Sequence, residues 1–317
     1  MTASTNVRHS KGAMVTQGRQ TDAQEGGFAM ITPYQNNSAD DLESHLAQIY
    51  EYGITMVSNV LSAAELRMLP ALIDRMYAVR ELHPTQQDEA VQNFNMCGNL
   101  ANHDPFFEEL CLRPAVYTIM QRLLGADVVL STIAALEPRA GATGENGAHL
   151  QGLHRDGLGA GLATKDLEGC QSLWLIDAMD PQNGGTRFGI GSHRLSPPEG
   201  TTNEDWARDE GRLVQMSMPA GCVIIYDART MHAMSNNYSG RRRRALACFY
   251  TKAGLPLMCD QRRYLAPEIQ RRASPQARVL LGLDSKQPIS ACGKFYDESG
   301  DAPEAIIVGQ HSRCNGP

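Results

Sequence analysis

LHRDGLG, at residues 153–159, contains a His-x-Asp motif, and MHAMSN, at residues 231–236, supplies a further histidine. In a β-strand, residues i and i+2 project from the same face, so a strand here would place His154 and Asp156 side by side. His232 would complete a set of two imidazoles and one carboxylate. That set binds non-haem Fe(II) and leaves coordination positions open for a co-substrate and oxygen.

Four stretches around these motifs have the composition of strands. The first three are rich in apolar and β-branched residues, and in the fourth successive side chains can alternate between two faces of a strand. The stretches are residues 128–138 (VVLSTIAALEP), 172–180 (SLWLIDAMD), 221–227 (GCVIIYD) and 241–250 (RRRRALACFY). The histidines therefore lie on or beside different strands, and the chain is predicted to be mainly β with flanking helices.

Arg243 is the candidate anion-binding residue. If residues 241–250 form a strand, Arg243 shares a face with Ala245 and Ala247, so one guanidinium enters a small, apolar interior. A buried guanidinium needs an anion, and its planar fork matches a carboxylate. The distal carboxylate of 2-oxoglutarate would meet this need. The alternative is a core arginine paired with an acidic side chain.

With these residues in place, the chain resembles the phytanoyl-CoA dioxygenase family of Fe(II)/2-oxoglutarate-dependent oxygenases, and most of all its natural-product branch. The resemblance begins in YGITMVSNVLSAAEL (residues 52–66), continues through NGGTRFGIGSH (residues 183–193) and reaches about Tyr250. It implies a double-stranded β-helix core of the jelly-roll or cupin-like type. It also implies Fe(II), with 2-oxoglutarate and O2 as co-substrates.

Carried over position by position, the resemblance implies that His154, Asp156 and His232 are the catalytic iron ligands. It implies that Arg243, eleven residues after His232, anchors 2-oxoglutarate. Two supporting co-substrate contacts are implied as well, at Gln151 and Thr186.

Two details of the pattern separate this chain from some relatives. Ile190 stands where the family commonly has the proline of a Pro-Gly-Ser-His turn, so that loop is expected to differ in shape. Asp156 supplies the carboxylate that halogenating relatives replace with a small residue, which argues against halogenation. His149 and His193 are the competing histidines, and both are expected to lie outside the iron ligand set.

The predicted activity is oxidation of a small, largely apolar secondary metabolite, such as a terpenoid or alkaloid, by hydroxylation, desaturation or rearrangement. One alternative is an acyl-CoA hydroxylase, which would need a basic surface for the coenzyme phosphates. A second is a non-catalytic, cupin-like metal-binding or sensor protein. Family members occur as monomers and dimers, which leaves a homodimer open.

The composition argues against several partners. The net charge of −6 and the pI near 5.9 do not suit nucleic acid or an anionic membrane surface, and no stretch approaches the length of a membrane span. A polyanion site at Arg241–Arg244 is the exception to consider, but strand periodicity divides this run between two faces. Eight scattered cysteines without a C-x-x-C motif indicate reduced thiols and a cytoplasmic location.

The chain is predicted to be a disordered N-terminal tail, residues 1–27, followed by a single oxygenase domain, residues 28–317. Within that domain, residues 28–127 supply helical support and the first strands, residues 128–252 the jelly-roll core, and residues 253–317 a C-terminal wrap. Helices are expected at residues 40–52, 62–82, 106–124 and 274–281, the second beginning with a Ser62/Glu65 capping box. The Gly-rich residues 139–152 are either a lid over the substrate or an ordinary surface loop.

Overall fold

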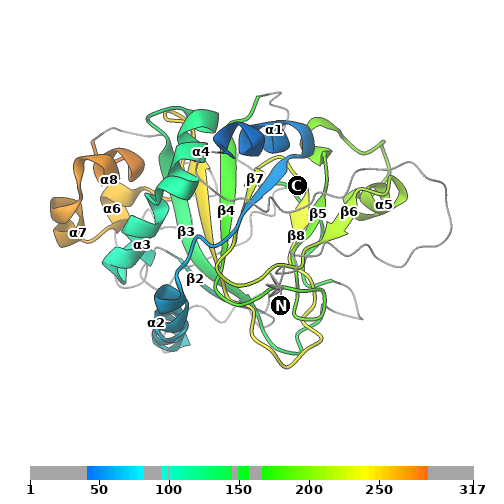
Figure 1. Ribbon diagram of the computed structural model, residues 1–317, viewed down its shortest axis with the longest axis horizontal. Coiled ribbons are helices and arrows are strands. Elements are labelled where there is room, and N and C mark those ends of the chain that lie inside the picture. Colours follow the sequence, from blue (N-terminus) through cyan, green and yellow to red (C-terminus); the bar gives the residue numbers. More distant parts are fainter. Residues whose placement is uncertain (1–40, 82–93, 99, 145–148, 157–165, 285–317) are drawn as a thin grey trace, which may run out of the picture.

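Two facing antiparallel sheets with helices around them form the centre of the protein (Figure 1). The computed structural model describes residues 41–81, 94–98, 100–144, 149–156 and 166–284. The predicted tail, residues 1–27, lies outside this part of the chain, as do residues 285–317 of the predicted C-terminal wrap.

The large sheet has six strands in the order β1-β7-β4-β9-β3-β2, and the small sheet has three in the order β6-β5-β8. The strands of the large sheet are β1 (Ile54–Val57), β2 (Phe94–Gly98), β3 (Val129–Pro138), β4 (Gly169–Leu175), β7 (Val223–Asp227) and β9 (Ala245–Thr251). Those of the small sheet are β5 (Arg187–Gly189), β6 (Leu213–Gln215) and β8 (His232–Ala233).

The strand order is that of a double-stranded β-helix, as predicted. From β3 onward, and with the isolated bridge between His154 and His232 as the second segment, the chain forms eight consecutive β segments. The first, third, sixth and eighth lie together in the large sheet, and the others lie in the small sheet. Two interlocked sheets of this kind define a jelly roll.

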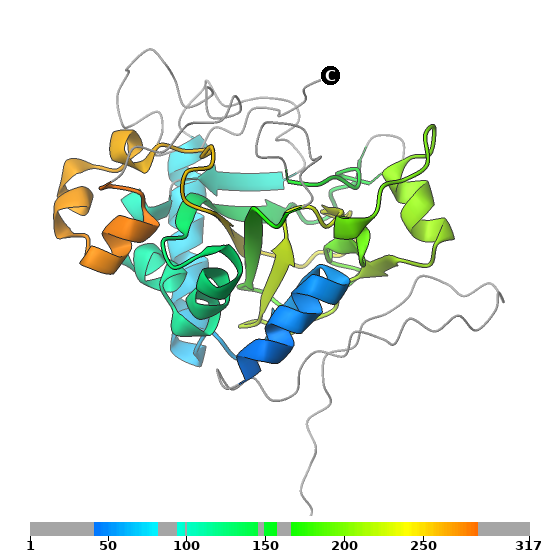
Figure 2. The ribbon, with the colours of Figure 1, turned by 90° about the horizontal axis from the view of Figure 1, so that it is seen from above.

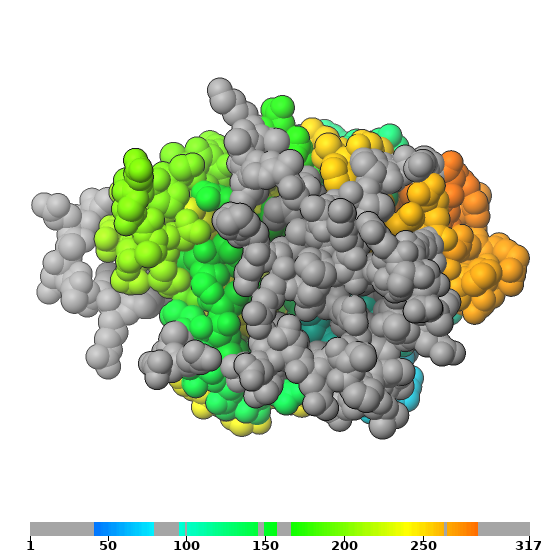
Figure 3. All heavy atoms as spheres, turned by 180° about the vertical axis from the view of Figure 1, so that it is seen from behind, coloured from blue at the N-terminus to red at the C-terminus, as the bar shows by residue number. Residues whose placement is uncertain are grey.

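Helices cover the outer face of the large sheet and the far side of the small one. They are α1 (Leu42–Tyr52), α2 (Ala63–Glu81), α3 (Pro105–Cys111), α4 (Pro114–Leu124), α5 (Asn203–Asp209), α6 (Gln261–Tyr264), α7 (Pro267–Arg272) and α8 (Pro275–Leu280). Helix α5 lies at the opposite end of the molecule from α6, α7 and α8 (Figures 2 and 3). In the part of the chain that the structure describes, no helix is both long and apolar enough to cross a membrane.

Alternation along the strands separates two apolar cores. On β4, Trp174 packs outward among the helices, whereas Leu173 and Leu175 face the space between the sheets. Across β9, Ala245 and Ala247 share that inner core. The predicted small, apolar interior therefore exists, and the iron and 2-oxoglutarate candidates lie around it.

The capping box at the start of α2 is confirmed. The Ser62 backbone N–H donates to Glu65 Oε2 at 2.7 Å, and the Glu65 N–H donates to Ser62 Oγ at 3.3 Å. The single helix predicted for residues 106–124 is wrong, because it is divided into α3 and α4. Pro114 causes the break: it disfavours a helical residue before it, and Arg113 is extended with φ −62° and ψ 123°.

The strand predicted for residues 241–250 is also partly wrong, because β9 begins only at Ala245. In the arginine run, backbone groups form hydrogen bonds with side chains and not with a neighbouring strand. Asn237 Nδ2 donates to the Arg241 carbonyl at 2.8 Å, and the Arg244 N–H donates to Asp177 Oδ2 at 2.8 Å. Likewise, the predicted strand at His154 and Asp156 is reduced to one isolated bridge at His154.

Candidate metal centre

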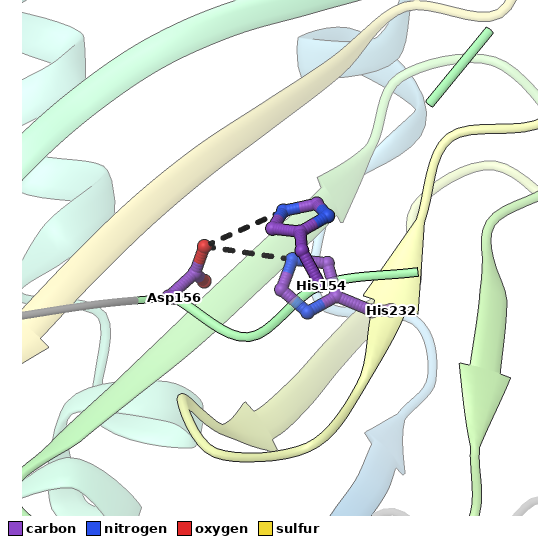
Figure 4. Close-up of side chains that lie close together, drawn as sticks. All are labelled: His154, Asp156 and His232. Carbon is purple, nitrogen blue, oxygen red and sulfur yellow. Dashed lines mark ion pairs between the residues drawn. The ribbon is translucent and has the colours of Figure 1, made fainter. Parts of the chain in front are cut away.

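The side chains of His154, Asp156 and His232 converge at one place (Figure 4). The backbones of the two histidines exchange hydrogen bonds, from His154 N to His232 O at 3.1 Å and in return at 2.8 Å. The Asp156 N–H donates to the Ala228 carbonyl at 2.9 Å, which brings the carboxylate back over the end of β7. Two chain segments, residues 154–156 and 228–232, thus meet at one point.

The side chains are spaced to bind one ion. Asp156 Oδ1 lies 3.6 Å from His232 Nε2 and 3.9 Å from His154 Nε2 (Figure 4). All three ligand atoms lie within 4.8 Å of one another, and no other group of three or more such side chains occurs among the described residues. The structure therefore brings together the predicted ligand set.

Backbone carbonyls orient both imidazoles. His154 Nδ1 lies 3.0 Å from the Gly152 carbonyl oxygen, and His232 Nδ1 lies 3.0 Å from that of Thr230. A carbonyl oxygen only accepts, so each Nδ1 carries the hydrogen and each Nε2 keeps its lone pair. The two lone pairs face the Asp156 carboxylate, as metal ligands require.

Charge and burial also suit a cation. Burial lowers the pKa of His232 to about 4, so its imidazole is neutral near neutral pH, the state that binds a metal. Asp156 Oδ2 is buried and has no hydrogen-bond partner among the described residues. A buried carboxylate oxygen without a partner is costly, and a bound cation would remove that cost.

The metal centre is open on one side. The side chain of His154 is 37% exposed and that of Asp156 24%, whereas that of His232 is 9% exposed. His232 packs instead against two aromatic rings of the interior, Phe188 at 6.1 Å and Tyr226 at 4.6 Å between centroids. A substrate would therefore approach from the side of His154.

Two interior residues near the triad were not predicted from the sequence. Gln171 lies directly across from Tyr226 in the β4–β7 register, and their side chains share a hydrogen bond. Gln171 Oε1 is buried and unpaired within the described part of the chain. Burial raises the pKa of Tyr226 well above its ordinary value, so its phenol stays protonated. The sequence held no local signal for this pair, because it depends on the register between β4 and β7.

Arg243 is buried, with 2% of its surface exposed, two residues before the start of β9. Its Nη2 donates to the Gly184 carbonyl at 2.9 Å, and its Nε has no partner among the described residues. Burial lowers the pKa of Arg243 to about 10, so the guanidinium remains charged near neutral pH.

The other three arginines of the run differ from Arg243. Each forms an ion pair with a carboxylate: Arg241 with Asp180 (2.6 Å), Arg242 with Glu137 (2.5 Å) and Asp74 (2.7 Å), and Arg244 with Asp177 (2.8 Å). Within the described residues, Arg243 has no such ion pair. Glu137 and Asp177 raise the pKa of Arg243 through their charge, but each forms its ion pair with a neighbouring arginine.

Gln151 and Thr186 are the remaining predicted co-substrate contacts. Gln151 Oε1 accepts from the Met234 N–H at 3.0 Å, which links the segment before His154 to the segment after His232. Thr186 is buried at the start of the small sheet, two residues after the carbonyl that contacts Arg243.

The competing histidines point elsewhere. His149 Nε2 lies 4.0 Å from Glu204, and His193 Nε2 lies 3.1 Å from the Tyr50 carbonyl oxygen. Neither belongs to the group of potential metal ligands.

Comparison with solved structures finds the same fold. The carbocyclase SnoK from nogalamycin biosynthesis superposes with a TM-score of 0.55 at 20% identity, covering 69% of this chain and 87% of that chain. The epimerase SnoN, solved with Fe3+, alpha-ketoglutarate and nogalamycin RO, gives a TM-score of 0.53 at 19% identity and the same coverage. HygX from Streptomyces hygroscopicus, solved with nickel and 2-oxoglutarate, gives 0.52 at 15% identity over 66% of this chain and 86% of its own.

Sequence comparison points the same way. Dioxygenase af480 of Aspergillus fumigatus is 23% identical over 271 residues, covering 82% of this chain and 84% of the relative. An uncharacterized protein of Mycobacterium tuberculosis is 26% identical over 261 residues, covering 79% of this chain and 89% of the relative. A model of the phytanoyl-CoA dioxygenase family matches residues 49–245, which include all three converging side chains and Arg243. The chain therefore belongs to the phytanoyl-CoA dioxygenase family, the Fe(II)- and 2-oxoglutarate-dependent oxygenases.

Proposed function

We propose that this oxygenase oxidises a small, largely apolar secondary metabolite, such as a terpenoid or alkaloid, at iron held by His154, Asp156 and His232. The observation that carries the proposal is the convergence of two oriented Nε2 lone pairs on a carboxylate with an unpaired buried oxygen. Similarity to the carbocyclase and epimerase of nogalamycin biosynthesis supports a tailoring reaction.

Arg243 would hold the distal carboxylate of 2-oxoglutarate. The guanidinium is charged, buried and without an ion pair among the described residues, so an incoming carboxylate would supply its missing partner. Ala245 and Ala247 leave room beside it in the inner core. We assign supporting contacts to Gln151, three residues before His154, and to Thr186, two residues after the Gly184 carbonyl that accepts from Arg243.

Iron, together with 2-oxoglutarate and O2, would supply the oxidising chemistry, and the protein would supply position and exclusion of water. His154 and His232 present Nε2 atoms whose orientation is held by the Gly152 and Thr230 carbonyls. Phe188 and Tyr226 close the inner side of the site. Whether hydroxylation, desaturation or rearrangement results depends on which substrate carbon these walls direct toward the open side.

Acyl-CoA is the less favoured substrate. The coenzyme phosphates require unpaired positive charge on the surface, but Arg241, Arg242 and Arg244 are each neutralised by a carboxylate. The same pairing disfavours nucleic acid as a partner at this run. We also propose a reducing, cytoplasmic setting, because the six cysteines within the described residues are buried free thiols.

An anaerobic titration of the apo-protein with Fe(II) and then 2-oxoglutarate tests the proposal. A visible charge-transfer band is expected when 2-oxoglutarate chelates the iron. Succinate formation in air should follow and should be abolished by His154→Ala. Iron binding without a band or succinate in the wild type would contradict the proposal and favour a non-catalytic metal-binding protein.

A further inference from the structure

The segment that carries His154 has little strand pairing to hold it. Among the described residues, its backbone pairs with other backbone at two places: the isolated bridge to His232, and the bond from the Asp156 N–H to the Ala228 carbonyl just beyond β7. A segment with so few ladder hydrogen bonds would not keep an imidazole within a few tenths of an ångström of its required place. Side chains from elsewhere must therefore contribute to positioning it.

Arg187, on β5, contacts this region through its side chain. Phe188 beside it faces the inner core and stacks on His232, so alternation directs Arg187 to the opposite face of the small sheet. There it is buried, with 3% of its surface exposed. Its three nitrogens bind three different segments: Nη2 donates to the Gln151 carbonyl (2.8 Å), Nε donates to Ser235 Oγ (3.1 Å), and Nη1 forms an ion pair with Glu204.

Helix α5 reinforces the same segment. Asn203, its first residue, donates from Nδ2 to the Leu153 carbonyl at 2.8 Å. Trp206 of the same helix packs with Leu153 and Met231 in a small apolar cluster. The backbone on the N-terminal side of His154 is thus held at residue 151 through Arg187 and at residue 153 directly by α5.

We propose that Arg187 is a positioning residue of the metal centre. It replaces the missing strand ladder by holding the Gln151–His154 backbone, the segment after His232 and α5 in one arrangement. The inference rests on the proposed function, since it assumes that His154 and His232 bind iron. It goes beyond that function by assigning the geometry of the centre to a guanidinium on the opposite face of the small sheet.

Arg187→Met, which removes the guanidinium but keeps an apolar stem, tests the proposal. Co(II) affinity and its visible spectrum are measured first, followed by the Fe(II)–2-oxoglutarate band and the thermal midpoint. We expect metal affinity about 10-fold or more below wild type, as for other partners that orient metal ligands, together with an altered Co(II) spectrum. Arg187→Lys can keep the Glu204 ion pair but not all three contacts, so its metal affinity should lie between those of Arg187→Met and the wild type.

Arg113→Met is the matched control. Arg113 also binds a glutamate (Glu65, 2.5 Å) and a backbone carbonyl (Val60, 2.8 Å), but it lies at the start of α4, on the helical side of the large sheet. This variant should lose thermal stability while retaining wild-type metal affinity and spectrum. If Arg187→Met does not fold, Arg187→Lys and Glu204→Gln supply the same comparison.

Two results would overturn the proposal: wild-type Co(II) affinity and spectrum in Arg187→Met, or an equal loss in Arg113→Met. A separate result concerns the proposed function. If the wild type binds Co(II) and Fe(II) but forms no band with 2-oxoglutarate, the oxygenase assignment of this site is wrong. The Co(II) comparison between the two arginine variants still decides the role of Arg187 in that case.

Discussion

Arg243 shows how neighbours of identical type acquire different roles. The arginines on both sides of it form ion pairs with carboxylates, whereas Arg243 is buried and donates to the Gly184 carbonyl. A buried charge without a counter-ion is expensive, and such costs persist where a ligand later supplies the missing charge. The position of one guanidinium thus defines the far end of the proposed co-substrate site.

Arg243→Ala should weaken 2-oxoglutarate binding by at least about 100-fold, because charge-assisted hydrogen bonds contribute about 1.5–3 kcal/mol each and two would be lost. Iron content should stay at the wild-type level, since Arg243 does not touch the triad. Titration of the charge-transfer band measures both quantities. Arg242→Ala is the control, and its 2-oxoglutarate affinity should equal that of the wild type. Unchanged affinity in Arg243→Ala would mean that another group anchors the co-substrate.

At the scale of elements, the junction between α1 and β1 depends on one glycine. Gly53 ends α1 in the left-handed region, with φ +79°, and donates its N–H to the Ile49 carbonyl at 2.9 Å. A Cβ on this residue would lie 2.3 Å from Thr230 Oγ1 and 2.6 Å from His193 Nδ1. Both the backbone conformation and the close packing therefore require glycine.

Gly53→Ala should reduce the free energy of unfolding by about 2–4 kcal/mol, from left-handed strain plus overpacking. Urea unfolding followed by circular dichroism measures the change. Gly141 also has a positive φ, of +74°, but a Cβ there would have no neighbour within 4 Å. Gly141→Ala should therefore cost only the backbone strain, about 1–2 kcal/mol. Equal losses in the two variants would contradict the packing argument.

A second connection between elements joins the start of α2 to the start of α4. The Arg113 guanidinium holds the pKa of Glu65 at about 2, below its ordinary value of 4.5. A carboxyl whose pKa is lowered on folding stabilises the protein above its unfolded value and loses that contribution as pH falls. The window for this pair therefore extends from about pH 4.5 down to about pH 2.

Glu65→Gln should remove this contribution, about 1–2 kcal/mol after allowance for solvent screening. The variant should unfold at a lower temperature than the wild type at pH 6, and the difference should shrink as the pH approaches 2. Thermal midpoints across this range provide the measurement. A difference that stays constant with pH would show that the lost contact is not electrostatic.

At the scale of the whole molecule, the two apolar cores have different roles. The outer core, between the large sheet and the helices, stabilises the fold, and the inner core, between the sheets, surrounds the proposed co-substrate path. Helix α5 is set apart from the other helices, at the end that carries the small sheet (Figures 1 and 3). The metal centre is therefore supported from one side by α5 and open on the side of His154.

Among the described residues, both cores are built from side chains at position 42 and beyond. Removing residues 1–27 should leave the thermal midpoint, iron content and succinate formation at wild-type values. The comparison requires full-length and shortened protein purified in parallel. A lower midpoint or lost turnover would show that these residues belong to the folded domain and that the predicted boundary is wrong.

The sequence by itself determined the features that depend on local spacing. The His-x-Asp pattern, the later histidine and the isolated interior arginine were sufficient to predict which side chains would meet. The Ser62/Glu65 capping box also follows from local order. Arg243 is buried as alternation predicted, although Arg241–Arg244 do not form a regular strand.

Only the tertiary structure decided how the candidate site is held. Gln171 meets Tyr226 through the β4–β7 register, and Arg187 meets Glu204 and Gln151 across three separate segments. The single bridge at His154, in place of a strand, also arises from competition between ladder bonds and side-chain contacts. Such contacts join residues far apart in the chain, and no local pattern encodes their register, because it is set only when the two sheets pack together.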